Sequence, residues 1–259
     1  MLSVQRKERL LEMLATEGRV VAKEAAVELA VSEDSIRRDL RELADAGLCI
    51  RVYGGAVPVP EADAPEHARR SIATDSKQRI ARAAVSLISA GSTIVLDAGT
   101  TTLAMAKMLP HGADLTVITP SPAVALAALE HSRARVLLVG GELSRHSAVT
   151  GGALALEAIS HLGADAFFLG VTGIDPVHGL TTGELDDAVT KRALAARSTD
   201  TYVLASAEKV GAVSRFPVLD LAAVAGVVFD PDDESDVAVS AWADALRAAA
   251  PEVGAGSPT

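Results

Sequence analysis

Hydrophobic positions in the first part of the chain repeat every three or four residues, as they do on one face of a helix. The repeat covers residues 3–16 and again 33–44, and residues 22–30 between them are rich in alanine and other good helix formers. The repeating positions are Leu10, Leu11 and Leu14 in the first segment and Ile36, Leu40 and Leu43 in the last. The pattern therefore predicts three consecutive helices.

The residues around the third helix predict where it begins and ends. Ser32 is a favourable N-cap, and two acids follow it in the first turn, where the helix dipole favours negative charge. Gly47 is typical of the residue just past a helix end. The β-prone run 48–53 and the pair Gly54-Gly55 come next. We therefore expect a short β hairpin after the third helix.

Later in the chain, short apolar runs alternate with helical segments. A helical run at 76–89 is followed by a strand-like run at 93–96, and most later strand-like runs are separated by alanine-rich helices. The later runs are 115–119, 135–139, 166–170, 201–205 and 224–229. This alternation predicts an α/β domain with a mainly parallel sheet covered on both faces. Such sheets bind ligands beyond the carboxyl ends of their strands.

Changes in composition indicate the domain boundaries. The proline-rich segment 57–67 is typical of a linker, and the small, Pro/Gly-rich segment 251–259 is typical of a disordered tail. We expect a helical domain at 1–56, an α/β domain at 68–231 and a C-terminal helix at 232–250.

The composition excludes several classes of protein. With 259 residues, 49% hydrophobic and 22% charged, the chain is ordinary for a globular protein that buries its own core. Cys49 is the single cysteine, which excludes an intramolecular disulfide, and the six histidines are dispersed, so we expect no metal site. The sequence shows neither a secretory signal nor a membrane-spanning run. We expect a cytoplasmic location.

The charge balance permits one kind of nucleic-acid site and disfavours another. The net charge is -10, but residues 1–60 carry nine Lys and Arg against ten Asp and Glu. A local site for double-stranded DNA is therefore allowed. With one Trp, two Tyr and four Phe, the chain has few rings for stacking on single-stranded bases.

The order of elements in the first domain is that of a winged helix-turn-helix. The major groove admits one helix, whose exposed face must offer hydrogen-bond donors to bases and phosphates. The candidate DNA contacts are Ser32, Ser35, Arg37, Arg38 and Arg41 on the third helix and Arg51 and Tyr53 on the wing. Asp39 lies among these arginines, and we expect it to orient them. On periodicity alone, a three-helix bundle with a solvated arginine face fits equally well.

In the second domain the strand 93–96 runs into Asp97-Ala98-Gly99-Thr100-Thr101-Thr102 and then a helix extending to Leu109. Free backbone N–H groups and Thr hydroxyls at such a turn can bind an anion. A structural turn capped by threonines is equally consistent. Asp97 would repel a phosphate, so we expect it to accept hydrogen bonds from loop N–H groups or ligand hydroxyls.

Small and polar residues also follow the other predicted strands. They are Thr119, Ser121, Gly140, Gly141, Gly170, Thr172, Gly173 and Lys209. Each glycine alone is explained by a tight turn. Their convergence on one edge of the sheet favours an effector pocket, in which Lys209 supplies positive charge.

Two stretches resemble the DeoR family of bacterial transcription regulators. VSEDSIRRDLRELADAGLCIRVYGGA is similar to its helix-turn-helix signature, V-S-x-x-T-I-R-R-D-L followed by L-x-x-x-G-x-L-x-R-x-x-G-G-A. Across 68–231, the family patterns K-x-x-I-A, D-x-G-T-T-T-x-x-x-A and E-A-x-x-K are matched from Lys77, from Asp97 and by Asp187-Ala188 with Lys191.

The resemblance implies a sensor domain similar in fold to ribose-5-phosphate isomerase. It also implies a repressor of carbohydrate genes that binds double-stranded operator DNA. Because symmetric dimers are the commonest closed assembly, we expect a dimer or larger homo-oligomer. No cofactor is implied, and a phosphorylated sugar is the implied effector. The chain departs from the family pattern at Thr119-Pro120-Ser121 and at Ala205–Lys209, where T-N-S and A-D-S-S-K are usual.

The isomerase-like fold leaves an enzyme as the alternative. A sugar-phosphate isomerase needs a carboxylate base. The candidates are Asp97, Glu184, Asp186, Asp187 and Glu208, and none lies in a recognisable catalytic motif. Dinucleotide-binding and P-loop motifs are lacking as well. We expect a regulator and not an enzyme.

Overall fold

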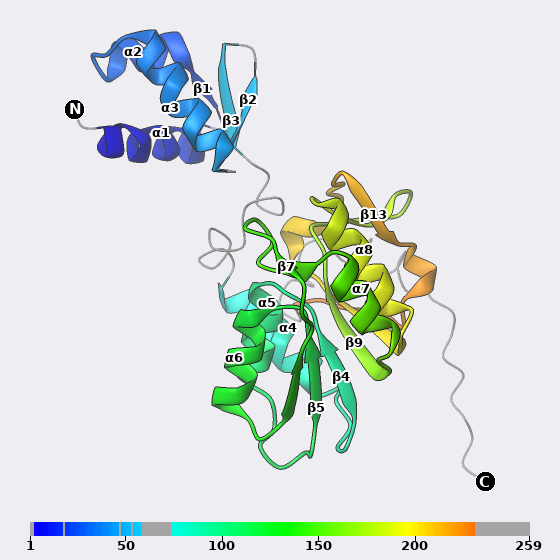
Figure 1. Ribbon diagram of the computed structural model, residues 1–259. Coiled ribbons are helices and arrows are strands. Elements are labelled where there is room, and N and C mark those ends of the chain that lie inside the picture. The colour runs from blue at the N-terminus through cyan, green and yellow to red at the C-terminus, as the bar shows by residue number, and fades with distance from the viewer. Residues whose placement is uncertain (1–2, 18, 47, 53, 59–73, 231–259) are drawn as a thin grey trace. The chain divides into compact units, whose positions relative to one another are not determined.

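The computed structural model describes residues 3–17, 19–46, 48–52, 54–58 and 74–230 (Figure 1). The chain divides into two compact units, residues 1–72 and 73–259. No helix within the described ranges is long and apolar enough to cross a membrane.

The first unit contains the three predicted helices and a small antiparallel sheet. The helices are α1 (Ser3–Glu17), α2 (Ala22–Glu28) and α3 (Glu33–Asp45), and the sheet has the order β1 (Val20–Val21), β3 (Gly55–Pro58), β2 (Cys49–Val52). Leu10, Ile36 and Leu40 are fully or almost fully buried between them. The predicted winged helix-turn-helix is therefore present.

Helix α3 begins as predicted but is anchored differently. The hydroxyl of Ser32 accepts a hydrogen bond from the Ser35 N–H at 3.2 Å, and Gly47 lies outside the described residues. Asp39 is buried and pairs with Arg6 of α1, so the expectation that it orients the arginines of α3 was wrong. Since Asp39 follows Ile36 by three positions, it faces inward on the helix.

The wing depends on its two glycines. Gly54 has a φ of +83°, which disfavours other residues, and a Cβ on Gly55 would lie 1.9 Å from the carbonyl oxygen of Val20. Strand β3 continues to Pro58, so residues 57–58 belong to the wing and not to the linker predicted at 57–67. The rest of that segment lies outside the described residues.

The second unit is built on a six-stranded parallel sheet in the order β14-β12-β9-β4-β5-β6. The strands are β4 (Thr93–Leu96), β5 (Thr116–Thr119), β6 (Arg135–Leu138), β9 (Ala164–Gly170), β12 (Ser198–Leu204) and β14 (Gly226–Val228). Each overlaps a strand that the sequence predicts. The predicted α/β fold class is confirmed.

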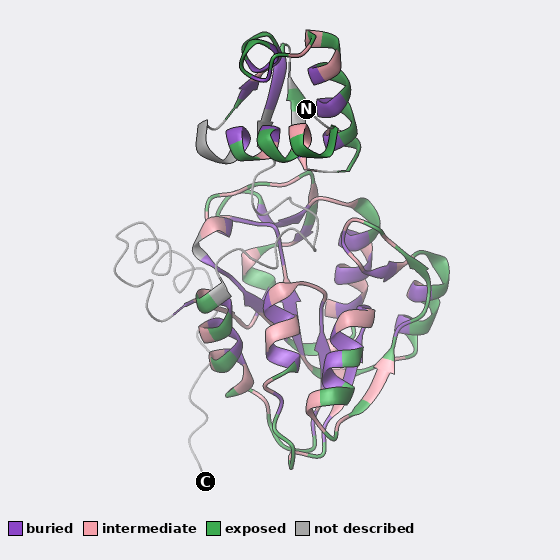
Figure 2. Cartoon of the chain, turned by 90° about the vertical axis from the view of Figure 1, so that its left-hand side faces the viewer, coloured by how far each residue is buried: buried purple, intermediate pink, exposed green. Residues whose placement is uncertain are grey.

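Helices cover both faces of this sheet, and Figure 2 shows the buried residues concentrated between the layers. One core joins the sheet to α4 (Thr74–Val85), α5 (Thr100–Ala106) and α6 (Pro122–His131), and the other joins it to α7 (Ala153–Ser160) and α8 (Leu185–Ala195). Two predicted helices are too long. Helix α4 ends at Val85 instead of residue 89, and α5 ends at Ala106 instead of Leu109, because turns with i→i+3 hydrogen bonds follow both.

Short antiparallel strands and two 3-10 turns outside the parallel sheet were not predicted from the sequence. They are the hairpin β7 (Glu142–Leu143) and β8 (Thr150–Gly151), the sheet β10 (Gly173–Asp175), β11 (Gly179–Thr182) and β13 (Phe216–Leu219), and the 3-10 turns η3 (Ala207–Lys209) and η4 (Leu221–Ala223). These strands contain glycine, proline or acidic residues and, unlike the strands of the parallel sheet, form no continuous apolar run. The predicted helix at 232–250 and tail at 251–259 lie outside the described residues.

The wing supplies the first testable prediction. Gly55→Ala places a methyl group against the backbone of Val20, which must shift, so we expect the first unit to lose about 1–3 kcal/mol of stability. Calorimetric unfolding measures the loss. Gly112→Ala is the control, because nothing lies within 4 Å of its added Cβ. Equal transition temperatures for the two variants would contradict the close approach.

Candidate DNA interface and sensor site

The outer face of α3 carries the predicted arginines. Arg38 and Arg41 are exposed, on the side of the helix opposite the buried Ile36 and Leu40. Arg37 is also exposed and forms an ion pair with Glu33 at 2.7 Å, one turn earlier. The guanidinium groups are thus available to phosphates and to guanine edges.

The remaining predicted DNA contacts have different surroundings. The hydroxyls of Ser32 and Ser35 lie 2.9 Å apart at the start of α3, so both contribute to its N-terminal cap. Arg51 is exposed on β2. Tyr53 lies outside the described residues. The helix, its cap and Arg51 therefore remain the observed parts of the predicted interface.

Two ion pairs hold α3 against α1. Arg6 binds the buried Asp39, which also accepts a hydrogen bond from the Ser3 hydroxyl at 3.2 Å, and Lys7 pairs with Glu42. These contacts fix the angle of the recognition helix relative to the helix that supports it. A fixed angle is what insertion into a major groove requires.

The structure brings the predicted sensor residues to one edge of the second unit. Asp97 follows β4, Thr119 ends β5, Gly140 and Gly141 follow β6, Gly170 ends β9, and Lys209 follows β12. These strands are parallel and adjacent, so their carboxyl ends lie together. This edge is where α/β sheets bind ligands.

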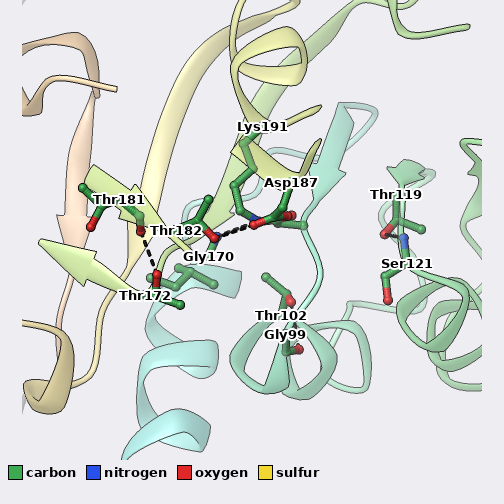
Figure 3. Close-up of polar contacts among 12 residues, drawn as sticks. Gly99, Thr102, Thr119, Ser121, Gly170, Thr172, Thr181, Thr182, Asp187 and Lys191 are labelled. Atoms are coloured by element: carbon green, nitrogen blue, oxygen red, sulfur yellow. Dashed lines mark hydrogen bonds and ion pairs between the residues drawn. The ribbon is translucent and has the colours of Figure 1, made fainter. Parts of the chain in front are cut away.

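A buried charge network lies beneath this edge (Figure 3). Oδ2 of Asp97 accepts hydrogen bonds from the Gly170 N–H at 2.9 Å and from Nζ of Lys191 at 2.7 Å. Nζ of Lys191 also lies 2.9 Å from Oδ1 of Asp187, whose Oδ2 accepts a 2.6 Å hydrogen bond from the Thr182 hydroxyl. The network ties β4, β9, β11 and α8 together.

Burial and charge act on this network in opposite directions. Burial raises the pKa of Asp97, and although Lys191 opposes that shift, the pKa stays above its ordinary value. Burial lowers the pKa of Lys191, but Asp187 and Asp97 outweigh it, and that pKa is raised. The charge of Lys191 is balanced by the two carboxyl groups that flank it. Oδ1 of Asp97 is buried and accepts no hydrogen bond.

The loop before α5 is shaped by Gly99. Its φ of +127° favours glycine, and its carbonyl accepts hydrogen bonds from the Leu103 N–H at 2.9 Å and from the Thr102 hydroxyl at 3.0 Å. Thr101 and Thr102 are buried, and Thr100 is half-buried. The Thr102 hydroxyl thus serves the turn itself.

Four other candidates have structural hydrogen bonds or close contacts. Thr119 accepts from the Ser121 N–H at 3.1 Å, and the Ser121 hydroxyl caps α6 by accepting from Val124. The Thr172 hydroxyl donates to Thr181 O at 3.0 Å, and a Cβ on Gly173 would lie 2.3 Å from Ala212 O. In Figure 3, Thr119 and Ser121 stand apart from Asp187 and Lys191.

Two residues that follow β12, Ser206 and Lys209, are more deeply buried than the sequence indicates. Lys209 is buried, and its Nζ donates to the Leu204 carbonyl at 3.3 Å. The Ser206 hydroxyl donates a hydrogen bond to a carboxylate oxygen of Glu208 at 2.6 Å. Two of the residues that depart from the family pattern therefore bind each other.

Sequence reasoning missed two features. Lys191 entered only as part of a family pattern, although its spacing of four from Asp187 places both on one helix face. A cavity of about 520 Å³ beside the start of α8 had no signal in the sequence, because the hairpin β7–β8 that borders it was not predicted.

Two protein-family models together match most of the chain. Residues 6–61 match the DeoR-like helix-turn-helix domain, and residues 72–231 match the DeoR C terminal sensor domain. The glycerol-3-phosphate regulon repressor of Escherichia coli is 35% identical over 213 residues, which are 82% of this chain and 84% of the relative. The transcriptional repressor GlcR of Bacillus subtilis is 31% identical over 214 residues, 82% of each chain.

Solved structures show similarity of fold alone. Ribose 5-phosphate isomerase A from Methanocaldococcus jannaschii aligns with a TM-score of 0.38 at 16% identity, over 52% of this chain and 54% of the isomerase. The translation initiation factor eIF-2B from Pyrococcus horikoshii aligns with a TM-score of 0.47 at 13% identity, over 89% of this chain and 91% of that one.

The charge network yields a prediction on stability. Lys191→Met leaves two buried carboxyl groups without their cation, which should cost about 3–5 kcal/mol. Adding Asp97→Asn to that variant removes one of the two acids and should restore part of the loss. Urea denaturation measures both. If the double variant lost as much free energy of unfolding as the Lys191→Met and Asp97→Asn variants lose together, Lys191 and Asp97 would not interact.

Proposed function

The chain belongs to the DeoR family of DNA-binding transcriptional regulators, and we propose that it represses genes of carbohydrate metabolism until a phosphorylated sugar releases it. The regulator class follows from family matches in both units and from relatives named as repressors. The enzyme alternative is not favoured, because these relatives are regulators and the similarity to isomerases is one of fold.

The observation that carries the proposal is the outer face of α3. It presents Arg38 and Arg41 to solvent, while the opposite face and the ion pairs to α1 fix the helix in place. Two copies of such a unit would read two half-sites on one face of the duplex. We therefore propose operator binding by a dimer or larger homo-oligomer.

We place the effector at the carboxyl edge of the sheet. The loop Gly99–Thr102 and the buried Lys209 contribute hydroxyls, backbone N–H groups and a positive charge there. Phosphate groups bind such donors well. The relatives support a phosphorylated ligand, since one is named for the glycerol-3-phosphate regulon. Release requires that the effector bind the DNA-incompetent state more tightly than the DNA-competent one.

The DNA interface can be tested by removing one arginine. Arg38→Ala should weaken operator binding by about 1–3 kcal/mol if it contacts a base, or reduce the salt slope by about one if it contacts a phosphate. Fluorescence anisotropy over a range of salt concentrations measures both. Arg133→Ala, an exposed arginine of the second unit, is the control. Unchanged affinity and salt slope for both Arg37→Ala and Arg38→Ala would show that α3 does not read the DNA.

The effector site can be tested at Thr101. Thr101→Ala removes a buried hydroxyl of the loop, so the sugar-phosphate concentration that releases DNA should rise about fivefold, with DNA affinity unchanged. Thr116→Ala, at the opposite end of the neighbouring strand β5, is the control. A parallel loss of DNA affinity and release would indicate misfolding, and no change in release would place the effector elsewhere.

A further inference from the structure

One edge of the parallel sheet is formed by β6, which pairs with β5 alone among the described strands. Its burial is low for this sheet. Arg135 and Leu138 are exposed at its two ends, whereas β4 and β5 each bury three of their four residues. Natural proteins usually protect a sheet edge by covering it or by placing charges or proline on it. After Arg135, the remaining residues of β6 are Val-Leu-Leu and give no such protection.

The backbone groups on the outer side of β6 face no described strand. Arg135 and Val139 donate their N–H groups to carbonyl oxygens of the β5 segment, both at 2.9 Å. Because backbone groups of successive residues in a strand point to opposite sides, those of Val136 and Leu138 point away from β5. The outer side of β6 therefore offers N–H and C=O groups to a further strand.

Helix α6 extends this apolar edge. It contacts β5, β6 and α5 and is the last described helix of its layer, at the margin of the second unit (Figure 1). On its outer surface Leu126 is 67% exposed and Leu129 is 60% exposed, and Leu138 of β6 is 50% exposed. A helix that is apolar on its outer surface as well as its inner one is normally covered on both. We call these three leucines the edge patch.

The segments outside the described residues join the second unit at the opposite edge of the sheet. Residues 59–73 precede α4, which contacts β12 and β14, and residues 231–259 follow β14 directly. Strands β14 and β6 are five strand spacings apart, or about 24 Å. This separation favours a second copy of the chain, and not these segments, as the partner of the edge patch.

The charges at the two ends of β6 are complementary to those of a second copy. Arg135 is exposed at the start of the strand, and Glu142 is exposed just beyond its end, after a pair of glycines. Antiparallel pairing of two β6 strands about a two-fold axis brings the basic end of each against the acidic end of the other. Parallel pairing would instead bring like charges together.

We propose that two copies of the chain associate through β6 and the edge patch, antiparallel, with Leu138 on the two-fold axis. In this register the two Leu138 residues exchange backbone hydrogen bonds, and Arg135 lies beside Glu142 of the partner subunit. The α6 helices of both copies lie on the same face of the joined sheet, where they cover each other's exposed leucines. The inference rests on the proposed function, to which it adds the surface that joins the operator-binding copies.

The test is the size of the full chain without DNA or sugar phosphates, measured by sedimentation over a range of concentrations. The chain should self-associate reversibly. Leu126→Glu should raise the Kd of self-association about tenfold or more, because it places a carboxylate in an apolar contact. Val177→Glu is the matched control and should leave this Kd unchanged, because Val177 is 85% exposed in the turn between β10 and β11.

Exchanging two charges tests the antiparallel orientation. Arg135→Glu and Glu142→Arg each bring like charges together across the contact, so each should raise the Kd about tenfold. The variant with both substitutions restores opposite charges and should recover most of the lost affinity. Recovery distinguishes a contact between the two residues from damage that either substitution does to its own chain.

Hydrogen exchange at the Leu138 N–H supplies a readout in the unaltered chain. Exchange should be slow at high protein concentration and should accelerate on dilution. The proposal is overturned if the chain is monomeric at every concentration. In a monomer, a protected Leu138 N–H would assign the edge to another segment of the same chain, and a rapidly exchanging one would leave it to a different partner.

The proposal is also overturned if the chain associates but Leu126→Glu and both single charge reversals leave its Kd unchanged, because the contact would then lie elsewhere. These measurements contain neither DNA nor effector. A failure of the interface therefore leaves operator binding intact, and a failure to bind an operator leaves the interface intact.

Discussion

The ammonium of Lys191 between Asp97 and Asp187 is the interaction on which the second unit depends. Charged groups are tolerated in a protein interior only when they are paired, and here one cation serves two carboxyl groups. Through Gly170 and Thr182 the same network reaches β9 and β11. It therefore sets how the parallel sheet, the antiparallel sheet and α8 meet at the carboxyl edge.

The position of this network connects the proposed effector loop to the rest of the second unit. Asp97 leads from β4 into the Gly99–Thr102 loop, so an effector bound there, as we propose, would act next to the buried charges. On its other side, Asp187 borders the cavity beside α8. A change at either place acts on a rigid, hydrogen-bonded framework. Such a framework favours discrete states over gradual deformation.

The recognition helix α3 is likewise held by a buried charge that is paired. Asp39 is buried in the first unit and is neutralised by Arg6, and the arginines of the opposite face are left to the solvent. One face of α3 is thus committed to packing and the other to a polyanion. The match of residues 6–61 to the DeoR-like helix-turn-helix domain agrees with these roles of the two faces.

Local patterns predicted most of the fold and less of the site. Periodicity and helix propensity found the three helices of the first unit, and continuous apolar runs found the six parallel strands, although three of these have only four residues and one has three. The strands β7, β8, β10, β11 and β13 were missed, because each contains a glycine, a proline or an acidic residue that interrupts such a run. Partners such as Arg6 for Asp39, and Lys191 for Asp97, lie 33 and 94 positions apart, so no local pattern could reveal them. The hydrogen bond from the Ser121 N–H to Thr119 and the capping of α6 by Ser121 likewise depend on geometry that spacing does not show.

The most direct test of a metabolite-controlled repressor is to sequence the genomic DNA fragments that the purified chain retains and that a mixture of sugar phosphates then releases. The account predicts a few fragments that share a repeated half-site and leave the protein when the sugar phosphates are added. A retained set with the same composition as the input DNA, unaffected by the sugar phosphates, would contradict it.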